Sequence, residues 1–207
     1  MAAGANSAIP AAGAKGWGGD PPLWEAARER LLDAAARCLD RVDLSDLGMG
    51  QVASEAGVSR QTVYRYFEDR DALISALLAR SAMRLADAVR MQLAAHSTAS
   101  EMAVECVMFG VERVSSDAVL RKIWEAAALD ARSLRGFTEP TALAFSRHAG
   151  ESLIAAAGWK GDEIDEALEV MIRFILSLLV SPSPREDADS RREFLRRRML
   201  PALSLTP

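Results

Sequence analysis

Residues 51–67 read QVASEAGVSRQTVYRYF, and this stretch decides how the first part of the chain folds. A small residue, Ala53, is followed four positions later by Gly57, which can adopt the left-handed conformation that a sharp turn after a helix requires. Ser59 is a good N-cap for a second helix, and Val63 returns an apolar side chain toward Ala53. The spacing predicts a helix-turn-helix.

The two short helices of this motif are expected over 49–55 and 60–67. On the second helix, the residues at or near the outer face are hydrogen-bonding or cationic types, which suit base edges and phosphates. These residues are Arg60, Gln61, Thr62, Tyr64, Arg65 and Tyr66. Between positions 56 and 67 the chain has two arginines and no acidic residue. This helix is therefore the candidate for reading DNA.

Helical periodicity continues on both sides of the motif. Apolar residues recur at three- and four-residue spacings from Trp24 to about residue 41, and again over 70–94, where Asp69 can act as the N-cap. Further helices are expected over 101–114, 118–130, 140–157, 163–180 and 190–200. No strand-like alternation of useful length occurs. The sequence therefore predicts an all-α fold of about nine helices, with a three-helix head followed by a helical-bundle body.

Composition supports a folded helical protein but not, at first sight, a DNA-binding one. The chain has 207 residues, of which 50% are hydrophobic and 6% aromatic, and its net charge is −4. A basic excess is the usual footprint of nucleic-acid binding. Residues 24–71 also carry ten acids against seven arginines. A DNA-binding head of this charge is expected to have modest non-specific affinity, since that affinity scales with the phosphates neutralised.

The chain shows no sign of export or of membrane insertion. The two cysteines, Cys38 and Cys106, form no disulfide framework, and residues 1–14 lack the pattern of a secretory signal. The most apolar stretch, 170–180, is too short to span a bilayer, which needs about 20 apolar residues. We therefore expect a cytoplasmic protein.

Over residues 31–73 the sequence resembles the DNA-binding head of the tetracycline-repressor (TetR) family of regulators. The matching stretches are LLDAA at 31–35, VA at 52–53, AGVS at 56–59, TVYRYF at 62–67 and DRDAL at 69–73. Tyr66 stands where the family commonly has a histidine, and Arg70 takes the place of a lysine.

This resemblance implies a role for each candidate residue on DNA. Three side chains would face the major groove: Arg60, Gln61 and Tyr64. Thr62 and Tyr66 would lie nearer the phosphates, with Arg65 on the same helix. Arg70, together with the start of its helix, would hold a phosphate, and Gln51 would touch the DNA backbone. Four of these residues have a plainer alternative, in which the rings of Tyr64 and Tyr66 pack, Thr62 serves the local turn and Arg65 is a solvated surface charge.

The body is predicted to hold a small-molecule site, because the TetR family senses small molecules there and bundles place such sites between helices. Methionine and aromatic linings would suit a largely apolar effector, although the same residues would also suit an ordinary core. The candidates are Met83, Met102, Met108, Phe109, Trp124, Phe137, Phe145 and Arg147.

A homodimer seam is predicted along 163–180 and the last helix. Past Val170 this helix is apolar nearly all round, so it must be covered on both sides. The alternative is a fully buried central helix in a monomer. The predicted seam residues are Ile164, Leu168, Met171, Ile175, Leu178, Leu179 and Phe194.

Together these observations predict a tail over 1–22, a DNA-binding head over 23–70, and an effector-binding and dimerisation body over 71–207. The expected function is that of a repressor released from a near-palindromic operator by a small molecule. We expect no catalysis, cofactor or metal: His96 and His148 stand alone, and the GMGQVA pattern at 48–53 lacks the strand that a dinucleotide site needs. The alternatives are a small all-α enzyme or carrier, and a protein-interaction module, whose head only resembles the motif.

Overall fold

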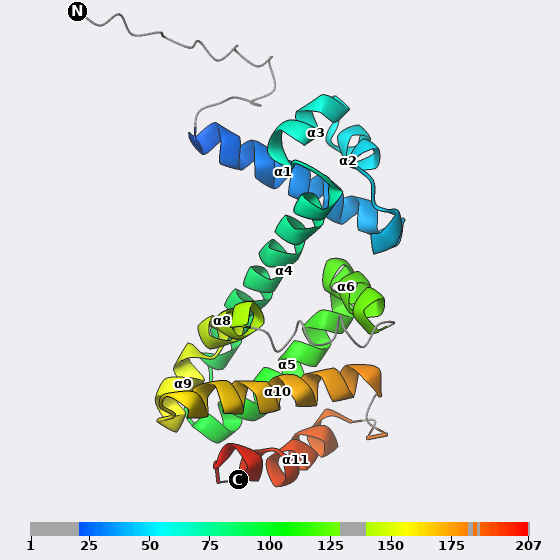
Figure 1. Ribbon diagram of the computed structural model, residues 1–207. Coiled ribbons are helices and arrows are strands. Elements are labelled where there is room, and N and C mark those ends of the chain that lie inside the picture. The colour runs from blue at the N-terminus through cyan, green and yellow to red at the C-terminus, as the bar shows by residue number, and fades with distance from the viewer. Residues whose placement is uncertain (1–20, 129–139, 182–183, 186, 207) are drawn as a thin grey trace, which may run out of the picture. The chain divides into compact units, whose positions relative to one another are not determined.

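The computed structural model describes residues 21–128, 140–181, 184–185 and 187–206. Within these ranges the regular structure is entirely helical, which confirms the all-α class. Ten α-helices and two short 3-10 helices follow one another along the described chain (Figure 1). The helices form two compact units.

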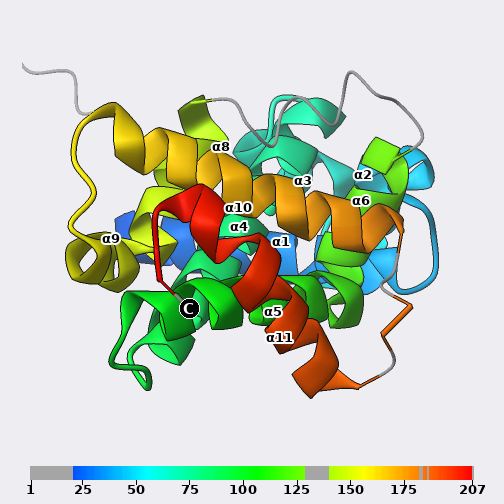
Figure 2. The same ribbon diagram turned by 90° about the horizontal axis from the view of Figure 1, so that it is seen from below.

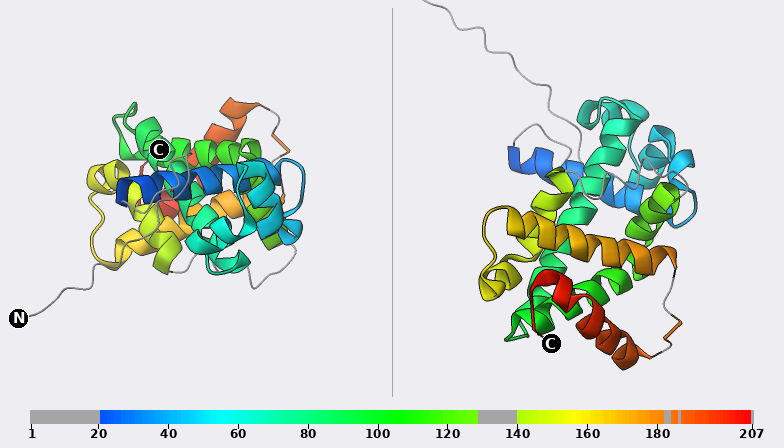
Figure 3. Two further views of the ribbon diagram at one scale, coloured as in Figure 1. Left: turned by 90° about the horizontal axis from the view of Figure 1, so that it is seen from above. Right: turned by 60° about the horizontal axis from the view of Figure 1, so that its bottom comes forward.

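The first unit extends to Leu77 and contains the predicted helix-turn-helix. Its short helices α2 and α3 pack against each other, and α2 also packs against α1 (Figures 1 and 3). The elements are α1 (Pro21–Leu39), η1 (Leu44–Asp46), α2 (Met49–Ala56), α3 (Arg60–Tyr66) and the start of α4 (Arg70–Leu93). Helix α1 begins three residues before Trp24, with a proline in its first turn, where the missing N–H is tolerated.

Each helix of this unit contributes one apolar face to a common core. On α1 the buried positions recur every three or four residues, as a helix with one buried side requires. Helices α2 and α3 are short and bury few side chains each, so their placement depends on this core more than on helix propensity. The buried side chains of this unit include Leu31, Leu32, Leu39, Leu47, Val52, Val63, Phe67, Leu73 and Leu77.

The second unit is organised around α5, which packs against α6, α9, α10, α11 and η3 (Figure 2). Figure 3 shows α10 (orange) crossing α5 (green). Besides the remainder of α4, the elements are α5 (Ala99–Ser116), α6 (Ala118–Ala128), α8 (Pro140–Ala149), α9 (Glu151–Ala157), α10 (Asp162–Val180), α11 (Ala188–Arg198) and η3 (Leu200–Leu203).

One hydrophobic cluster holds this second unit together. It combines Val89 and Leu93 of α4 with buried residues of α5, α9, α10, α11 and η3. The C-terminal segment is fastened to it, because the Trp159 indole N–H donates to the carbonyl oxygen of Leu203 at 3.3 Å. Clusters of this kind supply most of a helical domain's stability.

The stretch 140–157, expected as one helix, is two helices that meet at Gly150. A Cβ on Gly150 would lie 3.2 Å from the carbonyl oxygen of Ser146 and 3.5 Å from the Leu168 side chain of α10. The absence of a side chain therefore lets the junction between α8 and α9 approach α10 closely. The periodicity of the sequence did not reveal this break, because apolar residues continue across it.

Candidate nucleic-acid interface

The turn between α2 and α3 has the geometry that its sequence predicts. Gly57 is left-handed, with φ of 67°, and the N–H of Val58 donates to the carbonyl oxygen of Ala53 at 2.9 Å. Ser59 then caps α3, because its hydroxyl accepts the N–H of Thr62 at 3.1 Å. Val63 is fully buried. The chain thus turns sharply after α2 and fixes which face of α3 points to solvent.

Four of the predicted DNA-reading residues lie exposed on α3. They are Arg60, Gln61, Tyr64 and Arg65. Tyr64 is 44% exposed. A solvent-facing surface of arginine, glutamine and tyrosine offers donors, acceptors and an apolar ring in one place, which are the groups that base edges in a major groove require.

Arg60 and Tyr64 contact each other, one helical turn apart. The guanidinium carbon lies 5.7 Å from the centre of the Tyr64 ring, and Nη2 lies 3.4 Å from the phenol oxygen, toward which it donates. The Tyr64 ring limits the rotamers that Arg60 can adopt, so the guanidinium group is held in one region of the α3 surface.

The TetR resemblance placed Thr62 and Tyr66 near phosphates, but in this structure both side chains contact other residues of the first unit. The Thr62 hydroxyl shares a hydrogen bond of 2.9 Å with Ser59 Oγ. The Tyr66 ring stacks on Trp24 of α1, with centroids 4.0 Å apart. The plainer alternatives for both residues therefore describe their contacts in this structure. Trp24 was not among the predicted site residues, and nothing near it in the sequence points to this partner.

Arg70 also points inward. Its Nε donates to the carbonyl oxygen of Leu47 at 2.7 Å, and Nη2 donates to those of Leu44 and Ser45 at 2.6 and 3.0 Å. The expectation of a phosphate contact overlooked these acceptors, because they lie more than 20 positions away in the sequence. Here the guanidinium joins α4 to η1 instead.

Gln51 lies exposed at the start of α2, as expected for a residue near a DNA backbone. Its carboxamide oxygen accepts the N–H of Gly48 at 2.7 Å and so closes the end of its own helix. A glutamine at the third position of a helix commonly takes this role. The local capping role had not been predicted for Gln51.

A second contact between α1 and α2 is built around Glu55. Its carboxylate accepts Arg37 Nε at 2.7 Å and Arg41 Nη2 at 2.5 Å. These hydrogen bonds from Arg37 and Arg41 lower the pKa of Glu55. Arg37 near the end of α1 and Arg41 just after it are four positions apart, and two like charges this close are unfavourable unless an acid from elsewhere lies between them. The spacing of these two arginines was the feature of the sequence that could have predicted an acidic partner such as Glu55.

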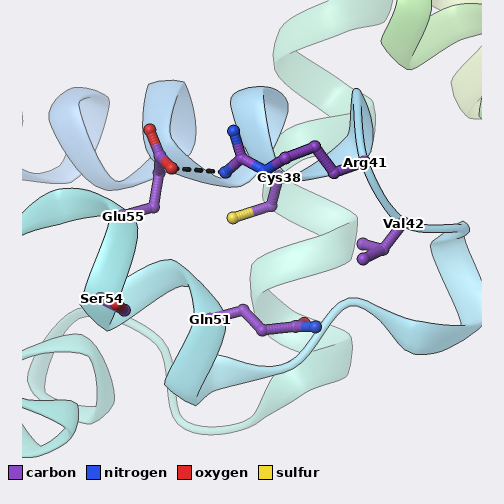
Figure 4. Close-up of a pocket in the computed structure, with 6 residues that line it drawn as sticks. All are labelled: Cys38, Arg41, Val42, Gln51, Ser54 and Glu55. Atoms are coloured by element: carbon purple, nitrogen blue, oxygen red, sulfur yellow. Dashed lines mark hydrogen bonds and ion pairs between the residues drawn. The ribbon is translucent and has the colours of Figure 1, made fainter.

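Beside the cluster is an open depression of about 380 Å³, shown in Figure 4. It lies between the end of α1 and the outer side of α2. Burial raises the pKa of the Cys38 thiol, so this cysteine is not activated as a nucleophile. Its lining residues are Cys38, Arg41, Val42, Gln51, Ser54 and Glu55.

The residues predicted to line an effector site differ in burial and in their contacts. Met102 is buried in the core of the second unit, and Met108 and Phe109 pack against it. Trp124 and Phe145 are half-buried, whereas Met83 is 41% exposed on α4. Arg147 is bound to Asp165 of α10 at 2.8 Å, so its charge joins two helices. Phe137 lies outside the described residues.

The predicted seam residues on α10 divide between two sides of the helix. Leu168 and Met171 are only 4% and 2% exposed in a single chain, so they belong to the subunit's own core and have no surface left for a partner. Ile175 and Leu178 pack against the same cluster from its edge, as does Phe194 of α11. Ile164 and Leu179 are partly exposed and do not belong to that cluster.

Neither a metal site nor a membrane span is found in the part of the chain that the structure describes. No group of three or more His, Cys, Asp or Glu side chains is suited to hold an ion there. No helix in the same ranges has both the length and the apolar character to cross a bilayer.

Known proteins resemble both the sequence and the fold. The profile of the family described as "Bacterial regulatory proteins, tetR family" matches residues 31–77. An uncharacterized HTH-type transcriptional regulator of Mycobacterium tuberculosis strain H37Rv, Rv1255c, is 30% identical over 177 residues, which is 81% of each chain.

Two solved structures extend the similarity over most of the fold. The TetR family repressor AlkX from Dietzia sp. strain DQ12-45-1b, implicated in biodegradation of n-alkanes, has a TM-score of 0.57 at 25% identity and covers 86% of this chain and 95% of its own. The multidrug binding protein EbrR complexed with ethidium has the same TM-score and identity, over 86% of this chain and 99% of its own.

Proposed function

The chain belongs to the TetR family of bacterial regulatory proteins, and from that premise we propose that it is a repressor which reads its operator with α3. Its relatives are transcriptional regulators and not enzymes, so the enzyme alternative is set aside. AlkX is named a repressor, which supports repression of transcription, and not activation, by this protein. Acting on bacterial DNA, the protein would work in the cytoplasm.

The observation that carries the proposal is the exposed face of α3. Arg60, Gln61 and Tyr64 point to solvent from a helix whose other side is fixed by Ser59 and Val63. A rigid helix that presents such side chains fits a major groove. Arg65 of α3 and Gln51 of α2 are also exposed and would contact phosphates.

Selection of bound duplexes from a random pool tests this directly. We expect enrichment of a near-palindrome whose half-sites lie about 34–36 Å apart or a multiple of that distance. A variant carrying both Arg60→Ala and Tyr64→Ala, which keeps the buried face of α3, should enrich nothing under the same conditions. A wild-type protein that enriches no sequence even at low salt would contradict the proposal.

A near-palindromic operator requires two copies of the chain, and we propose that the outer side of α10 joins them. Val180 is 62% exposed at the end of this helix, and Leu179 beside it is only partly covered. Adjacent exposed apolar residues that form one patch commonly mark an association surface. In sedimentation, wild type should be a dimer and the Leu179→Glu/Val180→Glu variant a monomer. The control variant Ala155→Glu, which places a charge on exposed α9, should stay dimeric.

We further propose that a small, largely apolar molecule releases the repressor. The second unit has partly exposed apolar side chains that could contact such a molecule. They are Met108, Phe109, Trp124 and Phe145. EbrR is named a multidrug binding protein and is complexed with ethidium, a flat aromatic cation, which supports a small-molecule effector. A ligand of the released state should raise the unfolding temperature and weaken operator binding together. Ethidium is a first probe for the stability measurement; compounds that stabilise the protein without weakening DNA binding would argue against the effector role.

A further inference from the structure

We propose that Arg70 is a positioning residue, which fixes the start of α2 against the start of α4 and does not bind a DNA phosphate. The inference rests on the proposed function, because the consequence of this positioning is operator affinity. It follows from three features of the first unit: the acceptors of the guanidinium, the place of those acceptors in the chain, and the charges around α4.

The guanidinium is directed into the protein by three carbonyl oxygens. Nε is bound to Leu47, and Nη2 is bound to both Leu44 and Ser45, at 2.6–3.0 Å. These carbonyls lie within and just after η1, where a helix end leaves acceptors without an intrahelical partner. A cation at such an end is favourable both as a hydrogen-bond donor and as a charge. The contacts therefore stabilise the connection between α1 and α2.

The hydrogen bonds from Arg70 to the carbonyl oxygens of Leu44, Ser45 and Leu47 form a clamp between α4 and η1, and this clamp ends next to the N-cap of α2. Leu47 is fully buried, and the next residue, Gly48, is the N-cap whose N–H is bound by Gln51. Fixing the carbonyl of Leu47 thus fixes where α2 begins. Because Gly57 makes a single sharp turn between α2 and α3, the position of α2 also determines the position of the exposed face of α3.

The surroundings of Arg70 disfavour a phosphate. Glu68, Asp69 and Asp71 flank it in sequence, and all three residues are exposed. The Asp69 carboxylate accepts the N–H of Ala72 at 2.7 Å and so already occupies the start of α4. Asp71 is 88% exposed in its side chain, with Oδ1 3.5 Å from Arg70 Nη1. Three carboxylates beside one arginine leave a net negative charge at this place, which repels an anion such as a phosphate.

The geometry also specifies arginine. A guanidinium presents several N–H groups in a fixed plane, so Nε and Nη2 can reach different carbonyls at once. A lysine keeps the positive charge but has a single compact ammonium group on a flexible chain. Arg70→Lys therefore separates the two roles: it preserves a charge for a phosphate but loses the planar fork that the clamp needs.

The test compares Arg70→Lys and Arg70→Gln with Arg90→Gln, a control that removes one exposed arginine elsewhere on α4. Operator affinity is measured over a range of salt concentrations, well below the unfolding temperature, together with amide exchange over residues 47–52. We expect both Arg70 variants to lose about tenfold in affinity, the scale of one hydrogen bond to a charged group. We also expect an unchanged salt slope and faster exchange at 47–52, with wild-type behaviour in the control.

Two results would overturn the inference. If Arg70→Lys binds like wild type while Arg70→Gln lowers the salt slope by about 0.9, Arg70 neutralises a phosphate. If both variants keep full affinity, the clamp only contributes to stability. A wild-type protein that selects no DNA at all would instead refute the proposed function, and the exchange measurement would still report whether the clamp orders the start of α2.

Discussion

Trp24 and Tyr66 lie face to face, with ring centroids 4.0 Å apart and an interplanar angle of 29°. The pair joins the beginning of α1 to the last residue of α3, across 42 positions of sequence. Arg65 lies over the ring of the same tyrosine, with its guanidinium carbon 5.3 Å from the ring centre. The end of the proposed reading helix is thus held by aromatic packing on α1.

Removing this stack should weaken both the first unit and DNA binding. Aromatic pairs contribute about 0.5–1.5 kcal/mol beyond the area they bury, so Trp24→Ala should lose at least that much unfolding free energy, and Trp24→Phe much less. Denaturant unfolding and operator binding measure the two effects. Trp159→Phe in the second unit is the control and should leave DNA affinity unchanged. Equal affinity in wild type and Trp24→Ala would show that the stack does not position α3.

Arg60 should specify one base pair in each half-site. A bidentate arginine contact to guanine discriminates by about 1–3 kcal/mol, so Arg60→Ala should relax the preference at one guanine and leave the other positions intact. Tyr64→Phe keeps the ring but removes the phenol oxygen near Nη2, so it should relax the same position less. Selection from a random pool with each variant shows the position directly. A uniform loss at every position would indicate a phosphate contact instead.

Glu55 should make the first unit sensitive to acid. Its pKa is lowered from the ordinary value of 4.5 by the hydrogen bonds from Arg37 and Arg41. A lowered pKa in the folded state contributes stability that is present above 4.5 and is lost as pH falls through the folded value. Glu55→Gln should therefore be less stable than wild type at neutral pH, and the difference should shrink below pH 4.5.

Thermal unfolding followed from pH 7 to pH 3 measures this convergence, over the acidic range in which carboxylates titrate. Glu151→Gln, which changes an exposed carboxylate on α9, is the control. A stability difference between wild type and Glu55→Gln that stays constant over this range would show that the two arginines do not stabilise the ionised carboxylate.

The crossing of α5 and α10 depends on Gly110. A Cβ there would lie 3.0 Å from Cδ1 of Ile175, the far end of a side chain that can shift. Alanine gains about 1 kcal/mol of helix propensity inside α5, which offsets part of an overpacking penalty of about 1–3 kcal/mol, so Gly110→Ala should cost about 1 kcal/mol of unfolding free energy. Ile175→Val removes Cδ1 and should cost about 0.5–1.5 kcal/mol alone. The Gly110→Ala/Ile175→Val double variant should lose less unfolding free energy than the sum of the two single losses. Additive losses would mean that the two positions are not in contact.

The sequence predicted best what depends on neighbouring residues. The turn at Gly57, the cap at Ser59 and the cap at Asp69 all use partners within a few positions, and the structure confirms each of them. Helix spacing likewise identified α10 as a helix that needs cover on two sides. It did not show which side meets the subunit's own core, because Leu168 and Leu179 are equally apolar in sequence.

The amino-acid sequence by itself determined the all-α class, the helix-turn-helix and the exposed side chains of α3, because these follow from local spacing and backbone preference. Only the tertiary structure decided what Tyr66, Glu55 and Arg70 bind. Their partners lie 14 to 42 positions away and are brought near by the docking of α1, η1 and α4 around the core. A basic or aromatic residue near a DNA-reading helix has the same appearance in sequence whether it faces a phosphate or a carbonyl. The direction of its side chain depends on which acceptors the fold brings within hydrogen-bonding distance.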